Sequence, residues 1–111
     1  MLHTFCSLKD CKDGASPDTP LLLDAADDLF GATPEGGGYD VDLNGIGGGV
    51  AFELSGTSLI VLHRFCARGG SACTDGWWPS GNLVMDASGH ILGTTLFGGA
   101  DGSGEVFRLT P

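Results

Sequence analysis

The sequence predicts an all-β fold made of antiparallel four-stranded meanders. Twenty of its 111 residues are glycine, against an average of about 7% in globular proteins, and each glycine inside a helix costs about 1 kcal/mol. No segment shows a sustained helical period with capping residues. Short apolar runs separated by Asp, Ser and Gly occur instead, and this pattern is typical of strands joined by tight turns.

The chain also matches itself, which indicates an internal repeat. Three pairs of segments align: 2–6 with 62–66, 21–33 with 83–95, and 50–54 with 105–109. The first repeat is the longer one, because its extra residues fall between Gly38 and Gly49.

The second repeat displays the expected elements in order. Leu83–Met85 is an apolar run, and Asp86–Gly89 is a turn, since Asp bonds nearby amides and Gly accepts positive φ. His90–Leu96 is then the return strand, and Val106–Leu109 alternates apolar and polar residues, as a half-buried strand does. Leu59–Phe65 is the strand that links the two repeats.

A four-stranded meander of roughly 50 to 60 residues has the size of a β-propeller blade. We therefore divide the chain into a first repeat at residues 1–58 and a second at residues 59–111. The chain opens on a segment expected to be the fourth strand of one unit, Leu2–Cys6, and ends on the third strand of another, Val106–Leu109. Because two blades cannot close a ring, we expect a head-to-tail homo-oligomer in which these two strands pair between copies. The alternative is a fragment of a longer tandem array.

The second repeat also resembles a known family. The segments that carry the resemblance are Asp75-Gly76, Pro79, the run from Asn82 to Gly99 with its Gly-Thr-Thr and Gly-Gly elements, and the run from Gly104 to Leu109. They are similar to the GloVer repeat, which occurs in tandem in choice-of-anchor surface proteins of bacteria. The resemblance implies an exported, propeller-like repeat protein and supplies no catalytic residues. The first repeat departs from it at Ala32, at Pro34-Glu35 and in the insert.

The charge of the chain restricts its partners. A formal net charge of −9, with five Lys and Arg against fourteen Asp and Glu, argues against binding to nucleic acid or to an anionic membrane surface. No apolar run, Leu21–Leu23 included, approaches the length of a membrane span. The partners that remain are a second copy of the chain, a glycan or a protein ligand.

Four cysteines occupy the same place in both repeats, ahead of an Asp-Gly pair. We predict two local disulfides, Cys6–Cys11 and Cys66–Cys73. Such bonds indicate an oxidising, extracellular or cell-surface location. The alternatives are a four-thiolate zinc site, which requires all four sulfurs to converge, and free thiols.

The insert of the first repeat contains a candidate calcium loop. Asp40, Asp42 and Asn44, followed by Gly45, have the spacing that opens an EF-hand loop. The twelfth position is Ala51, so the bidentate Glu is missing. The alternative is an Asx-rich surface loop, and no other cofactor is expected.

Trp77 and Trp78 are the candidate ligand-binding residues. Neighbours in an extended strand point to opposite faces, so one ring can pack inside while the other stacks on a sugar or a partner. Packing of both rings is the alternative. The chain has no G-x-S-x-G motif, and its histidines fit structural roles. We therefore predict a non-catalytic, self-assembling repeat module, with a carbohydrate-binding or glycan-processing domain as the alternative.

Overall fold

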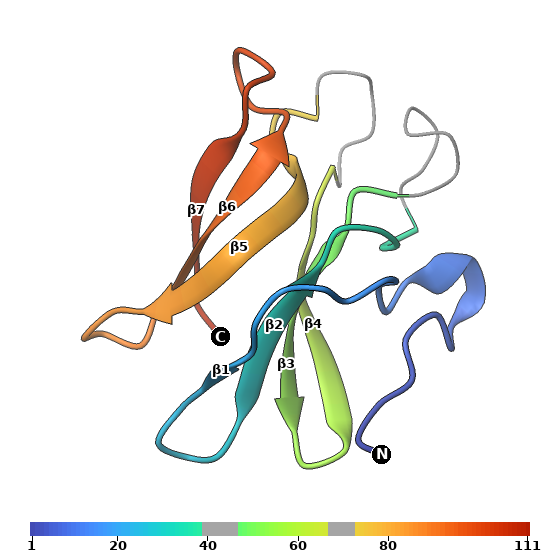
Figure 1. Ribbon diagram of the computed structural model, residues 1–111, viewed down its shortest axis with the longest axis vertical. Coiled ribbons are helices and arrows are strands. Elements are labelled where there is room, and N and C mark those ends of the chain that lie inside the picture. The colour runs from blue at the N-terminus through green and yellow to red at the C-terminus, as the bar shows by residue number, and fades with distance from the viewer. Residues whose placement is uncertain (39–46, 67–72) are drawn as a thin grey trace.

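The computed structural model describes residues 1–38, 47–66 and 73–111 and confirms the all-β class (Figure 1). The described strands form two antiparallel sheets, one of four strands and one of three. The only helical element among these residues is a 3₁₀ turn, η1, at Lys9–Cys11. The first sheet contains β1 (Leu22–Leu23), β2 (Leu29–Thr33), β3 (Val50–Ser55) and β4 (Ser58–Arg64); the second contains β5 (Trp77–Met85), β6 (Ile91–Phe97) and β7 (Glu105–Leu109).

Both sheets are meanders whose first turn is organised by an aspartate. The Asp24 carboxylate accepts hydrogen bonds from the amides of Ala26 and Asp28, each at 2.9 Å. Asp86 accepts the same two bonds at 2.9 Å in the second repeat, from Ser88 and His90. The side chain thereby replaces the partners that these turn amides lose outside the sheet, as the sequence predicts.

The two repeats also share contacts deeper in each sheet. The Thr33 hydroxyl donates to the Glu35 carbonyl and accepts from the Val50 amide. Thr95 makes the equivalent pair of bonds, to the Phe97 carbonyl and from the Glu105 amide. The aromatic rings repeat as well, because Phe5 lies 5.1 Å from Phe52 and Phe65 lies 5.0 Å from Phe107, measured between ring centroids.

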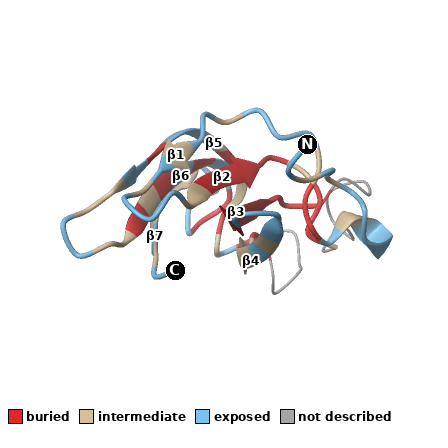
Figure 2. Cartoon of the chain, turned by 90° about the horizontal axis from the view of Figure 1, so that it is seen from below, coloured by how far each residue is buried: buried red, intermediate tan, exposed pale blue. Residues whose placement is uncertain are grey.

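The main core lies between the two sheets. Phe30 of β2 packs with Leu83 of β5 and Ile91 of β6, and all three are buried. Figure 2 shows the buried segments gathered where β2 and β3 lie. Because side chains alternate between the two faces of a strand, β1 and β2 use one face for this core and turn the other away from the second sheet.

The expectation for Leu2–Cys6 is wrong for the single chain, since no strand begins before Leu22 in the described residues. A strand needs a free sheet edge beside it, and Figure 1 shows β7 and the N-terminal segment on different sides of the molecule. The linking strand, β4, pairs with β3 and completes the first sheet. The second sheet therefore has three strands and lacks a counterpart of β4.

The repeats offer a matched pair of leucines for testing this core. Leu83 is 7% exposed, whereas Leu21, at the equivalent position of the first repeat, is 58% exposed. In dilute protein, Leu83→Ala should lower the free energy of unfolding by about 2–5 kcal/mol, and Leu21→Ala should change it by about 0.5 kcal/mol or less. Urea unfolding followed by tryptophan fluorescence measures both. Equal losses would contradict the packing of the second sheet on the first.

Candidate functional site

The cysteines form the two predicted disulfides, Cys6–Cys11 and Cys66–Cys73. Each closes a loop that is also held by backbone bonds, because the Cys6 amide donates to the Gly14 carbonyl and the Cys66 amide to the Gly76 carbonyl, both at 3.0 Å. With all four sulfurs bonded in pairs, no thiolate is left for zinc. The disulfides fix the segment that precedes the Asp-Gly pair in each repeat.

A histidine and an aspartate meet beside each disulfide loop. His3 Nε2 lies 3.0 Å from Asp13 Oδ2, and His63 Nε2 lies 3.2 Å from Asp75 Oδ2. Each imidazole ring also makes an edge contact with the phenylalanine two residues later, Phe5 or Phe65. These pairs were not predicted from the sequence, although the joint recurrence of the histidine and the Asp-Gly pair was a signal for them.

Asp13 is the most constrained ionisable side chain in this region, being 1% exposed. Burial alone raises its pKa, but hydrogen bonds from the Ser7 hydroxyl and from the Ser7 and Leu8 amides outweigh it and lower the pKa of Asp13 below the ordinary value. The hydroxyl bond measures 2.8 Å. The carboxylate therefore organises the disulfide loop as an anion, which is a structural role.

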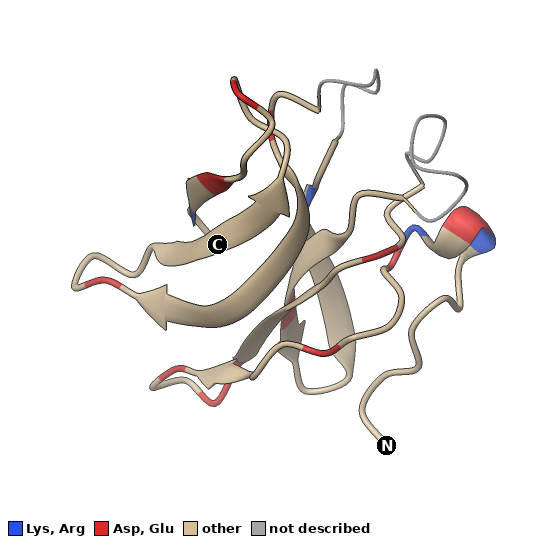
Figure 3. Cartoon of the chain, turned by 45° about the horizontal axis from the view of Figure 1, so that its top comes forward, with Lys and Arg blue, Asp and Glu red and all other residues tan. Residues whose placement is uncertain are grey.

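The acidic residues of the described chain lie mostly in turns and loops, as Figure 3 shows. Burial raises the pKa of Glu53 on β3, and the negative charges of Asp28 and Asp24 raise it further. The β1–β2 end of the first sheet thus gathers three acidic side chains, Asp24, Asp28 and Glu53. An anionic partner is disfavoured there, in line with the net charge of the chain.

The candidate calcium ligands Asp40, Asp42 and Asn44 lie outside the described residues. Within residues 1–38, 47–66 and 73–111, no group of three or more His, Cys, Asp or Glu side chains could hold a metal ion. None of the helices in that part of the chain is long and apolar enough to cross a membrane.

Trp77 and Trp78 begin β5, but their rings do not point to opposite faces. The rings contact each other edge to face, with centroids 6.3 Å apart. The reason is the backbone at Trp78, whose positive φ of 62° interrupts the extended conformation on which the expected alternation depends. The Trp78 amide instead donates to the Gly48 carbonyl at 2.9 Å and ties β5 to the first repeat.

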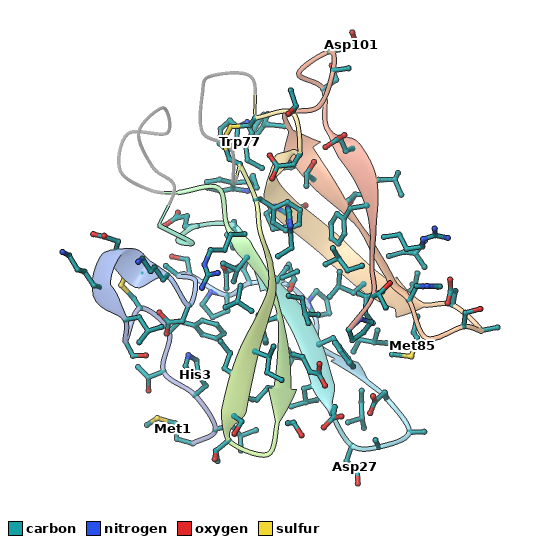
Figure 4. All side chains as sticks on the ribbon, turned by 180° about the vertical axis from the view of Figure 1, so that it is seen from behind. Met1, His3, Asp27, Trp77, Met85 and Asp101 are labelled. Carbon is teal, nitrogen blue, oxygen red and sulfur yellow. A yellow bond between two sulfur atoms is a disulfide. The ribbon has the colours of Figure 1, made fainter. Side chains whose placement is uncertain are left out.

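Trp77 lines a surface hollow of about 430 Å³ together with Phe97, Asp101 and the backbone of residues 98–102. The Trp77 and Phe97 rings are 4.7 Å apart and inclined by 31°. Figure 4 shows Trp77 and Asp101 at the same end of the molecule. Phe97 escaped the sequence prediction because its repeat counterpart, Glu35, is not aromatic and gives no periodic signal.

The second notable surface is the open edge of the second sheet. In the part of the chain that the structure describes, β7 pairs with β6 on one side only, and Val106, the second residue of β7, is 77% exposed. Its repeat counterpart, Ala51 on β3, is 1% exposed and pairs with His63 of β4. An unpaired edge presents a row of backbone donors and acceptors to another strand.

Comparison with models of protein families gives no match. Comparison with curated proteins gives none, and comparison with solved structures also gives none. The similarity to the GloVer repeat therefore stays a prediction, and the function has to be argued from the geometry of these surfaces.

The Asp13 cluster makes stability depend on pH in a defined direction. Because the pKa of Asp13 is lower in the folded chain than its ordinary value of 3.8, the carboxylate stabilises the fold above that pH, and this contribution is lost as the pH falls through the folded-state pKa. Asp13→Asn should lower the free energy of unfolding at pH 7 by about 1–3 kcal/mol. The difference in the free energy of unfolding between Asp13→Asn and the wild-type protein should disappear as the pH falls below the ordinary pKa of the Asp13 carboxyl.

Urea unfolding at a series of pH values measures this gap. Asp101→Asn, an exposed loop substitution, is the control and should leave the profile unchanged. A gap that stays constant into the acid range would contradict the role of the Asp13 charge.

Proposed function

We propose that the protein is a non-catalytic, self-assembling β-repeat module of an exported or cell-surface protein, whose propeller-like blades are completed between chains. The observation that carries the proposal is the open edge of β7. The corresponding strand of the first sheet is β3, and its edge is paired with β4. The strand that would fill the edge of β7 has a counterpart within the same sequence. Residues 2–5, Leu-His-Thr-Phe, correspond to residues 62–65, Leu-His-Arg-Phe, at the end of β4.

The first sheet supplies the register for such pairing. On β3 and β4, Ala51 pairs with His63 and Val50 with Arg64. At the equivalent positions of the repeat alignment, Val106 would pair with His3 and Glu105 with Thr4. A second copy that adds its N-terminal segment to β7 would therefore form a fourth antiparallel strand, as β-augmentation does in other proteins.

The disulfides support the proposed location outside the cell. Both loops close over fewer than ten residues, and disulfides of this kind persist in oxidising compartments. The low content of basic residues fits a role that involves protein or glycan rather than nucleic acid.

Light scattering on size-separated protein at micromolar concentration tests the assembly. We expect a mass of three or more chains, because a heterologous contact must either close a ring or continue as a filament. Deletion of Met1–Thr4 should reduce the mass to one chain while keeping the Cys6–Cys11 disulfide and a cooperative thermal transition. A wild-type protein that is a stable monomer at these concentrations would contradict the proposal.

The register can be checked in the same experiment by cross-linking. A chain carrying both Thr4→Cys and Glu105→Cys should form a disulfide-linked ladder on oxidation, because each copy then joins two neighbours. Thr4→Cys alone is the control and should give nothing larger than a linked dimer. Absence of the ladder from protein that still assembles would exclude this register.

The hollow beside Trp77 favours a second candidate function, the binding of a carbohydrate. Aromatic faces pack against the apolar faces of sugar rings, and a few polar groups fix the orientation of a ligand in a concave site. Here Trp77 and Phe97 provide the aromatic surface, and Asp101 provides a hydrogen-bond acceptor beside it. The site combines ring contact with a carboxylate at the rim.

A glycan array followed by calorimetry tests this candidate. A neutral oligosaccharide should bind to the wild-type protein, and Trp77→Ala should weaken binding at least tenfold because the ring contact is lost. Trp78→Ala is the matched control and should retain most of the affinity, since Trp78 does not line the hollow. An array without any binder would exclude the carbohydrate function.

A further inference from the structure

The contact between the two repeats of one chain is formed by one face of each sheet. In the second sheet, Leu83 and Ile91 lie on the inner face with Phe107 and Leu109 beside them. In the first sheet, Leu22 and Phe30 supply the opposing face. The chain thus shows directly how one repeat packs against the repeat that follows it.

The first sheet has the same inner face, but nothing in the described residues covers it in the way that the first sheet covers the second. An apolar groove of about 330 Å³ lies there, which we call the repeat groove; it is lined by Leu2, Phe5, Leu21, Leu29, Phe52 and Leu54, among others. The repeat alignment matches these six residues to Leu62, Phe65, Leu83, Ile91, Phe107 and Leu109. All but Phe65 of these counterparts belong to the core between the sheets.

The exposed fractions of equivalent leucines show that the repeat groove lacks a covering sheet. Leu83 is 7% exposed under the first sheet, whereas its counterpart Leu21 is 58% exposed. Leu2 is 53% exposed as well, whereas Phe52 and Leu54 at the floor of the groove are buried. The sequence therefore keeps apolar packing residues at the rim of the groove, where the single chain leaves them open to water. Contiguous apolar surface of this kind marks an interaction site in a protein.

The second sheet carries the complementary surface on its other side, which we call the outer face. By strand alternation it contains Val84, Leu92 and Val106, the counterparts of Leu22, Phe30 and Ala51. Val84 is 56% exposed and Val106 is 77% exposed. In the first sheet, Leu22 and Phe30 pack against the second repeat, whereas their counterpart Val84 and the neighbouring Val106 are exposed on the second sheet.

We propose that the repeat groove of one copy binds the outer face of a second copy, so that the contact between copies repeats the contact between the two sheets of one chain. The inference rests on the proposed self-assembly and names the surfaces that join. The two contacts are compatible, because Leu2 and Phe5 border the groove and residues 2–5 belong to the segment expected to reach β7. One junction would then combine strand addition at β7 with face packing at Leu21 and Val84.

Two single substitutions separate the surfaces. Leu21→Asp places a charge in the repeat groove and leaves the outer face intact, and Val84→Asp does the reverse. Because burial of an unpaired charge is strongly unfavourable, each variant alone should lose at least a hundredfold in association and behave as a single chain in light scattering. An equimolar mixture should give a discrete species of two chains, since the intact groove of the Val84→Asp chain meets the intact outer face of the Leu21→Asp chain.

The control is Leu8→Asp, at a residue that is 55% exposed on the disulfide loop and lines neither surface; it should assemble like the wild type. Assembly that survives both Leu21→Asp and Val84→Asp would overturn the face contact but leave strand addition at β7 intact. Variants that stay monomeric when mixed would show that the two surfaces are not partners. If Leu21→Asp lowers the thermal midpoint, Leu21→Gln replaces it, with the same mixing result expected.

Discussion

The structure depends on one constraint, which is that both sheets carry apolar side chains on both faces and each sheet can cover only one face of the other. Phe30, Leu83 and Ile91 are buried because the first sheet lies against the second. In a chain of this size, no third layer among the described residues covers the remaining faces. The exposed Leu21 and Val84 follow directly from this arrangement. Removing apolar area from water is the dominant favourable term in folding and in most association between proteins, so the same term that joins the two sheets would drive the proposed contact with a second copy.

Local interactions decide where the segment before each Asp-Gly pair lies. The disulfide, the buried Asp13 carboxylate and the His3 ring hold residues 3–14 in a defined loop without strand pairing. The loop brings Phe5 onto Phe52, as the second loop brings Phe65 onto Phe107. A strand that has no edge to pair with in its own chain is thereby kept in position. Such preorganisation lowers the conformational entropy that an added strand loses when it binds.

The parts of the fold that the sequence could predict are those set by neighbouring residues. The turns at Asp24 and Asp86 depend on a carboxylate and amides only a few residues away, and the disulfides depend on short loops, so both were predictable. The backbone of Trp78 was not, because its positive φ accompanies a bond to Gly48 of the other repeat. Leu2–Cys6 has the pattern of a strand but lacks a partner edge, and pairing is a property of the whole fold. The hollow at Trp77 depends on Phe97, which is distant in sequence and not repeated.

The repeats differ most at the end where their glycine loops lie. In both, a glycine amide donates to a cysteine carbonyl, from Gly37 to Cys11 and from Gly99 to Cys73. The first repeat surrounds this frame with Lys12 and Arg64, whose Nε donates to the Lys12 carbonyl. The second surrounds it with Trp77 and Phe97. A backbone frame that is fixed by disulfides and hydrogen bonds thus carries a hollow lined by the charged residues Asp10, Lys12 and Arg64 at one glycine loop and an aromatic hollow at the other. The apolar residues of the sheet faces have apolar counterparts in the other repeat because both sets pack against a neighbouring sheet, whereas the side chains around the glycine loops differ between the repeats.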